Sequence, residues 1–249
     1  MADAIFEEQR LAEVYDPLHP DRGDLDLYLA LAAEFNARSA LDIGCGTGTL
    51  ACLLAQRGLD VTAVDPAAAS LEVARTKSRA EQVEWIHGDV ASLPPLQVDL
   101  VIMSGNVAQV FLTDDEWTAT LMAVGSALRP GGHLVFECRD PAREVWREWS
   151  RRATCRQVEL PEIGALETWV DLVDVDPPFV SFRWTFIFGF DGAVLTSDST
   201  LRFREQGEIT DSLGDVGFVV EAVLDAPDRP GQEFVFVATR ASVLRTQGN

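Results

Sequence analysis

The chain has 249 residues with 40 acidic and 20 basic side chains, which gives a formal net charge of -20 at pH 7. Such a surface repels phosphate backbones and anionic lipid, so nucleic acid and membranes are disfavoured partners. No apolar run approaches the roughly 18 residues of a membrane span and the acidic start lacks a secretory signal pattern, so we expect a cytoplasmic protein.

A helical cover is predicted for residues 1–37, where apolar side chains recur at helical spacing in two segments. The segments are FEEQRLAEVYD and DLDLYLALAAEF, and Pro17 and Pro20 lie between them. Because proline interrupts helical hydrogen bonding, the two segments are expected to be separate helices.

Strands and helices alternate from residue 38 to residue 140. The apolar segments at 39–43, 60–65, 83–89, 98–105 and 133–137 are typical of strands. One of the helices between them is expected to begin with a capping box formed by Thr113 and Glu116. This alternation predicts a parallel sheet with helices on both faces.

An antiparallel β insertion is predicted for residues 153–204. In VSFRWTFIFGF, apolar side chains occupy every second position from Val180 to Phe190, and the following Asp191–Gly192 suits a tight hairpin. Three roles for this aromatic face are open: packing on the domain, a roof over a hydrophobic pocket, or a contact in a homodimer.

Residues 205–240 are expected to return to the main sheet with one helix and two final strands joined as a hairpin. We therefore predict a single α/β domain over residues 1–249. Its core is a Rossmann-like, doubly wound, mostly parallel sheet of seven strands with an antiparallel edge hairpin. The ligand-binding part of that core is expected at 38–140, because open α/β sheets bind ligands at the carboxyl ends of their parallel strands.

The glycine-rich stretch LDIGCGTGTL, residues 41–50, follows the first predicted strand of the core. A P-loop requires a lysine that this stretch lacks. A dinucleotide fingerprint requires glycine at its sixth position, where this chain has Thr49, and the third glycine comes one residue early at Gly48. The acid before the loop, Asp42, suits a cationic ligand better than a diphosphate.

Five motifs in order resemble those of the class I S-adenosylmethionine-dependent methyltransferases. They are D-x-G-x-G-x-G, an acid at the end of VTAVDP, an acid in IHGDV, the strand VDLVIMSGN and the segment RPGGHLVFE. The resemblance covers roughly residues 38–140 and the final hairpin. It implies S-adenosyl-L-methionine as the cofactor and methyl transfer as the reaction.

The resemblance also implies which residues contact the cofactor. Asp42 would position the ammonium end, Asp65 would accept from the ribose hydroxyls, and Asp89 with the backbone of Val90 would bind the adenine. The cover carrying Tyr15 would close over the cofactor, and Cys45 is expected as a small loop side chain. The full predicted set is Tyr15, Asp42, Gly44, Cys45, Gly46, Asp65, Pro66, Asp89, Val90 and Met103.

The acceptor is expected to be a small molecule. The loop after the fourth strand, MSGNVAQVF, departs from the [DN]-P-P-[FY] pattern of the methyltransferases that act on bases of nucleic acid. Asn106, Glu137 and Arg139 are candidate acceptor contacts, and the sequence identifies neither a general base nor whether the accepting atom is N or O. No Cys-x-x-Cys spacing is present, and we expect no metal.

Two alternatives to a methyltransferase stay open at this point. The same fold could bind the cofactor for another reaction or as a non-catalytic sensor. A nicotinamide oxidoreductase is disfavoured because the sixth-position glycine is absent.

Overall fold

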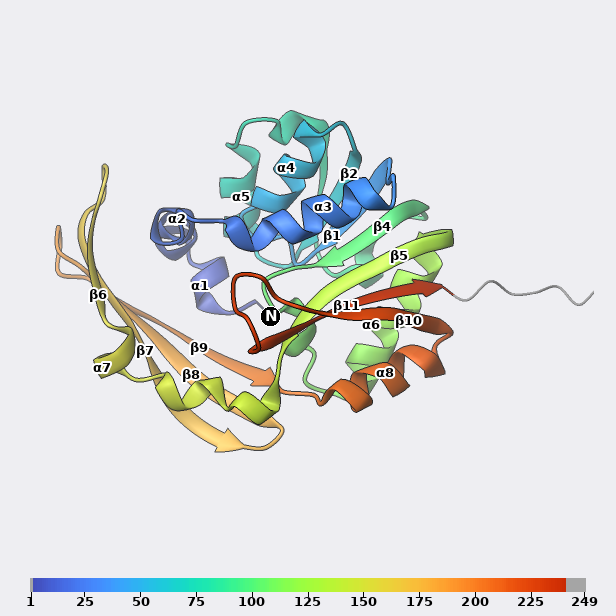
Figure 1. Cartoon of the computed structure of the whole chain (residues 1–249). Coiled ribbons are helices and arrows are strands. Elements are labelled where there is room, and N and C mark those ends of the chain that lie inside the picture. Colours follow the sequence, from blue (N-terminus) through green and yellow to red (C-terminus); the bar gives the residue numbers. More distant parts are fainter. Residues whose placement is uncertain (1, 241–249) are drawn as a thin grey trace, which may run out of the picture.

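The structure, a computed structural model, describes residues 2–240 and contains two sheets (Figure 1). The core sheet has seven strands in the order β10-β11-β5-β4-β1-β2-β3. Their bounds are β1 Ser39–Ile43, β2 Asp60–Asp65, β3 Val83–His87, β4 Val98–Met103, β5 Leu128–Arg139, β10 Phe218–Asp225 and β11 Glu233–Arg240.

The pairing of these strands confirms the predicted fold class. Strands β1 to β5 pair in parallel, whereas β11 runs antiparallel to β5 and β10 antiparallel to β11. The strand order reverses direction between β1 and β4, which is the position where open α/β sheets place their ligands.

Helices cover both faces of the core sheet, as alternation of strands and helices predicts. The α-helices are α1 Ala4–Glu7, α2 Gln9–Leu18, α3 Asp26–Glu34, α4 Thr49–Gln56, α5 Ala68–Arg75, α6 Asp114–Ala127, α7 Arg151–Thr154 and α8 Gln206–Asp215. Short 3-10 turns are η1 Gly23–Leu25, η2 Ala80–Gln82, η3 Val90–Ser92, η4 Val107–Val110, η5 Pro141–Arg143 and η6 Val145–Glu148. No helix within residues 2–240 is long and apolar enough to cross a membrane.

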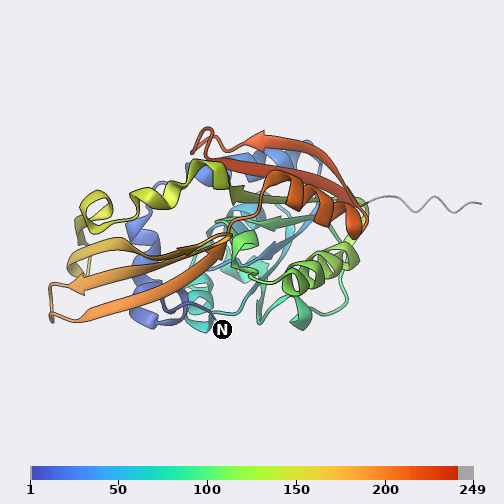
Figure 2. The same cartoon turned by 90° about the horizontal axis from the view of Figure 1, so that it is seen from below.

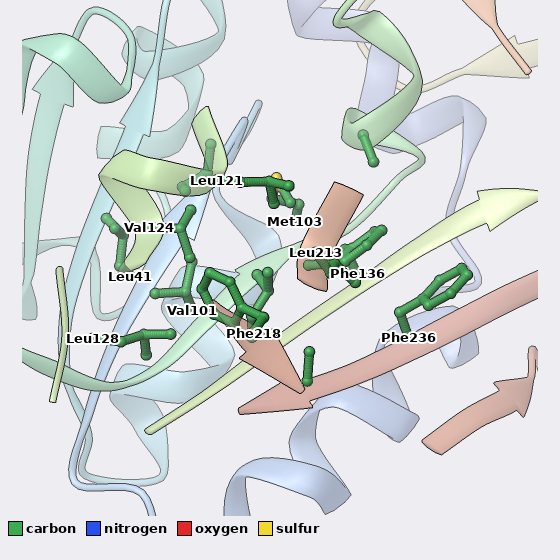
Figure 3. Close-up of a cluster of buried hydrophobic side chains, with 14 of the residues drawn as sticks. Leu41, Val101, Met103, Leu121, Val124, Leu128, Phe136, Leu213, Phe218 and Phe236 are labelled. Atoms are coloured by element: carbon green, nitrogen blue, oxygen red, sulfur yellow. The ribbon is translucent and has the colours of Figure 1, made fainter. Parts of the chain in front are cut away.

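Buried side chains pack on each face of the sheet. Figure 3 shows the face covered by α6 and α8, where Met103, Leu121 and Phe136 pack together. The opposite face packs against α3 and α4. The predicted capping box is confirmed: the amide of Glu116 donates to Thr113 Oγ1 over 3.1 Å, and the Glu116 carboxylate accepts from the Thr113 amide over 3.0 Å.

The insertion forms a separate antiparallel sheet in the order β6-β7-β8-β9. Its strands are β6 Arg156–Leu160, β7 Gly164–Asp176, β8 Phe179–Phe188 and β9 Val194–Arg202. Figures 1 and 2 show this sheet extending from one side of the core, with α1 and α2 packed against it.

The aromatic face of β8 is shorter than the sequence predicts. Phe186 and Phe188 are each 1% exposed and pack on α1 and α2, whereas Phe190 is 89% exposed. The alternation ends because the chain turns after Phe188, where the Gly192 amide donates to the Phe188 carbonyl over 2.9 Å. The hairpin turn therefore begins before Asp191, and Phe190 lies in the turn.

Candidate functional site

The predicted site residues gather at the carboxyl edge of the core sheet. The glycine loop follows β1, Asp65 ends β2, the 104–106 loop follows β4, and Glu137 lies near the end of β5. These strands are neighbours in the sheet, so their carboxyl ends meet around the reversal between β1 and β4.

The glycine loop has a backbone that other residues adopt only with strain. Gly44, Gly46 and Gly48 have φ values of 68°, 52° and 74°. A Cβ on Gly44 would lie 2.5 Å from Val107, and one on Gly48 would lie 2.4 Å from Trp85. A Cβ on Gly46 would meet nothing within 4 Å, so open space borders the loop at that residue.

Asp42 lies beside this loop as a buried acid without a hydrogen-bond partner. Its side chain is 1% exposed, and neither carboxylate oxygen is hydrogen-bonded within residues 2–240. Burial raises the pKa of Asp42 to about 8, and the negative charge of Asp65 adds to this rise. A buried, unpaired carboxylate is costly, and a ligand that brings a positive charge would remove that cost. The site therefore fits a cationic group.

Asp65 connects β2 to the glycine loop. Its Oδ2 accepts the Gly46 amide over 2.7 Å and its Oδ1 accepts the Ala67 amide over 2.8 Å. Burial raises its pKa. Each oxygen has a further lone pair, so the carboxylate can also accept hydrogen bonds from the hydroxyl groups of a ligand. Pro66 follows, and its carbonyl contacts the ring of His87 at 3.1 Å.

Three other predicted contacts have different surroundings. Asp89 is exposed and caps η3, with Oδ1 accepting from the Ala91 amide over 2.9 Å. Val90 packs partly on the apolar core, and Met103 is 0% exposed within it (Figure 3). For Met103, only the backbone can therefore face a ligand, because its side chain points into the core.

Burial raises the pKa of the Cys45 thiol well above its usual range, with the charge of Asp42 adding to the effect. The residue therefore stays a neutral thiol near pH 7. This agrees with the expectation of a small loop side chain rather than a nucleophile.

On the acceptor side, both carboxylate oxygens of Glu137 accept hydrogen bonds from the protein. Its carboxylate accepts from the Tyr28 hydroxyl over 2.5 Å, from the Gly105 amide over 2.8 Å and from the Asn106 amide over 3.1 Å. Burial raises its pKa, followed by the charge of Glu233. In this structure, Glu137 thus anchors the loop after β4 to the cover.

Asn106 and Arg139 belong to the same network. Asn106 Nδ2 donates to Glu233 over 3.3 Å, and its Oδ1 has no partner within residues 2–240. Arg139 lies 3.6 Å from Glu233 and donates to Gln109 over 3.0 Å. Burial lowers the pKa of Arg139. The structure thus brings all three acceptor candidates together, although the sequence had indicated neither Tyr28 nor Glu233.

The cover reaches the site through α2. The ring of Tyr15 lies 5.7 Å from that of Phe6 and 4.9 Å from that of His19, and burial raises its pKa. The next residue, Asp16, accepts from Thr47 of the glycine loop over 2.7 Å. Within residues 2–240, no group of three or more His, Cys, Asp or Glu side chains could hold a metal ion.

Comparison with known proteins finds sequence similarity to methyltransferases over part of the chain. Residues 40–132 match the family model described as a methyltransferase domain. The cypemycin N-terminal methyltransferase of a Streptomyces species is 33% identical over 147 residues, which are 57% of this chain and 60% of that relative. The chain thus spans less than two thirds of this relative's length.

Two solved structures share the fold over nearly the whole chain. A S-adenosylmethionine-dependent methyltransferase from Clostridium acetobutylicum has 18% identity and a TM-score of 0.75, covering 94% of this chain and 99% of that one. An amino pentose methyltransferase from Micromonospora echinaspora has 22% identity and a TM-score of 0.72, covering 92% and 97%. The fold is that of class I methyltransferases.

Proposed function

We propose that this chain, which is similar to methyltransferases, is an S-adenosylmethionine-dependent methyltransferase that transfers a methyl group from S-adenosyl-L-methionine to a small-molecule acceptor. The observation that carries the proposal is the buried, unpaired carboxylate of Asp42 beside a glycine loop with open space at Gly46. A cofactor with a cationic amino-acid end would supply the positive partner that the Asp42 carboxylate lacks.

The residues around the loop support the rest of the cofactor site. Asp65 is held in place by two backbone amides, which leaves lone pairs for the ribose hydroxyls. Asp89 and the backbone of Val90 stay the proposed adenine contacts. The sulfonium supplies an activated methyl group, so the chain's contribution is to bind and orient the two reactants and exclude water.

We propose an amine nitrogen as the methyl acceptor. One relative is named as an N-terminal methyltransferase, and structural neighbours include methyltransferases of an amino pentose and of a glycopeptide nitrogen. The net charge of -20 also favours a cationic acceptor over nucleic acid. Asn106 and Arg139 stay candidate contacts for it, with Glu137 holding the loop that carries Asn106.

Calorimetry with S-adenosylmethionine, S-adenosylhomocysteine and NADH tests the cofactor. We expect binding of the first two and none of NADH, and absence of binding by the first two would refute the proposal. S-adenosylhomocysteine release is then measured with a panel of amino sugars and short peptides. Cofactor binding without release across that panel would favour a sensor.

Two further expectations belong to this proposal. Phe190 is 89% and Val194 is 58% exposed at the β8–β9 hairpin, and we propose them as the surface of a homodimer, one of the three roles left open for the insertion. Size-exclusion chromatography of the native chain and of Phe190→Ser tests it, and a native monomer would refute it.

All four cysteines are free thiols, which suits the reducing cytoplasm.

A further inference from the structure

We propose that Asp16 and Lys77 form a latch that holds the cover on the glycine loop and sets how fast the cofactor enters and leaves. The latch consists of Asp16, Lys77, Thr47 and Thr49. The inference rests on the proposed function, because it assumes that the glycine loop binds the cofactor. It assigns to Asp16 and Lys77 a positioning role, not a catalytic one.

The contacts of the latch join three parts of the chain. Asp16, on α2, accepts from Thr47 over 2.7 Å and from Thr49 over 3.4 Å. Lys77, just after α5, donates to the Asp16 carboxylate and to Thr49 over 3.0 Å. Thr47 lies between two of the loop glycines, and Thr49 begins α4. The two charged groups thus tie the cover to both the loop and the helix that follows it.

Lys77 is unusual within this chain. It is the only lysine among the 20 basic residues. Its compact ammonium has rotatable donors that can serve two acceptors at once, whereas a guanidinium has a fixed planar fork. Its side chain is 21% exposed and that of Asp16 is 28% exposed, so the pair is partly shielded from water. Such a pair interacts more strongly than an ion pair on the open surface.

Helix α1, at the start of the cover, lies between the core and the insertion (Figure 1) and contacts both. Glu7 accepts from the Ala68 amide over 2.9 Å at the start of α5, on the core side. The Ile5 amide donates to Ser197 on β9 over 2.9 Å, on the side of the insertion. The latch joins the cover, through Asp16, directly to the glycine loop, through Thr47.

Access to the buried proposed cofactor contacts, Asp42 and Asp65, requires the cover to move, whereas Asp89 is exposed. With the latch formed, Asp42 is 1%, Asp65 6% and Thr47 5% exposed. A ligand can reach such buried groups only when the structure above them opens, so opening limits both its arrival and its departure. Breaking the latch removes part of the free energy that opposes opening.

The test is stopped-flow binding of S-adenosylhomocysteine, followed by tryptophan fluorescence, with the variants Asp16→Asn and Lys77→Met. We expect association and dissociation rates that each rise about tenfold, because a hydrogen-bonded charge pair is lost, while Kd changes less than about threefold. Lys77→Arg should restore part of the slow exchange. The double variant should behave like either single one.

Arg10→Met is the matched control. Arg10 lies on α2 and forms an ion pair with Asp191 at 2.9 Å, but it touches the insertion rather than the loop. Its exchange rates should equal those of the native chain. A raised Kd with unchanged association in the latch variants would overturn the proposal, as would unchanged rates, because both results mean that the pair does not oppose opening.

A second readout needs no ligand. Acetylation by an N-hydroxysuccinimide ester marks Lys77 as the only lysine, and mass spectrometry of its peptide follows the rate. We expect slow labelling in the native chain and faster labelling in Asp16→Asn. Equal labelling in both would overturn the latch. Failure of the native chain to bind S-adenosylhomocysteine would instead refute the proposed function, since slow labelling can persist without it.

Discussion

Replacement of Asp42 by asparagine tests the central feature of the site, a buried acid with no hydrogen-bond partner in residues 2–240. Burial, and then the charge of Asp65, raise its pKa from 3.8 to about 8 in the folded chain. Because the folded state holds this proton more tightly than the unfolded state, the resulting stabilisation is complete below about pH 4. It is lost as the pH rises towards about 8.

The size of this loss follows from the pKa difference. Each pH unit between 3.8 and about 8 corresponds to ~1.4 kcal/mol, so the ligand-free chain loses at most ~6 kcal/mol across this range. Water entry and relaxation around the charged carboxylate reduce that value. We expect Asp42→Asn to be more stable than the native chain by ~2–4 kcal/mol at pH 8 and nearly equal to it at pH 4.

Urea unfolding of both chains without cofactor, followed by circular dichroism at pH 4, 6 and 8, measures the difference. The same substitution should weaken S-adenosylmethionine binding at least about tenfold, since the ligand's ammonium group loses its counter-charge. At pH 7, binding to the native chain should release up to about one proton from Asp42, and calorimetry in buffers of different ionisation enthalpy detects it.

Two results would refute this reasoning. The first is a stability difference between the chains that does not change from pH 4 to pH 8. The second is native cofactor binding at pH 7 without proton release, combined with unchanged affinity in Asp42→Asn. Either result would mean that this carboxyl group is ionised and solvated in the free chain.

Four further substitutions test cofactor binding or stability. Asp65→Ala should weaken S-adenosylmethionine binding at least about tenfold in calorimetry while circular dichroism is unchanged, because the ribose loses its carboxylate; equal affinity would contradict this assignment. Gly48→Ala places a Cβ 2.4 Å from an indole ring at positive φ, so urea unfolding should show a loss of ~2–3 kcal/mol. Gly46→Ala, which meets no atom within 4 Å, should cost only ~1 kcal/mol, and equal costs would mean that the ring moves aside freely. Tyr28→Phe removes a donor to buried Glu137 and should lower stability by ~1–2 kcal/mol in the same assay; a native-like curve would show that this bond adds no net stability.

Local patterns in the sequence were sufficient for much of the architecture. The alternation of apolar segments predicted the parallel strands, because side-chain period and turn residues are properties of short stretches of chain. The spacing of the three loop glycines separated this loop from a dinucleotide site, and the structure gives each of them a positive φ. The capping box at Thr113 was likewise predictable, since both of its partners lie within one helical turn.

Other features depended on elements that are distant in sequence. Met103 stays a predicted cofactor contact, and its side chain lies in the core because α6 and α8 pack on that face of the sheet. Phe190 follows the alternating pattern of its strand, but the strand ends before it. In both cases, the burial of the side chain depends on which other elements pack beside it, and the local pattern does not encode that packing.

The partners of the site residues were also decided by tertiary structure. Tyr28 bonds Glu137 across 109 positions in the chain, and Asp16 bonds Lys77 across 61. A single sequence contains no periodicity that pairs such residues, because their meeting depends on how the cover docks on the sheet edge. The sequence by itself therefore determined the strands, the glycine loop and the kind of cofactor to expect. The packing of distant elements, including the docked cover, decided which site residues are buried and which are paired.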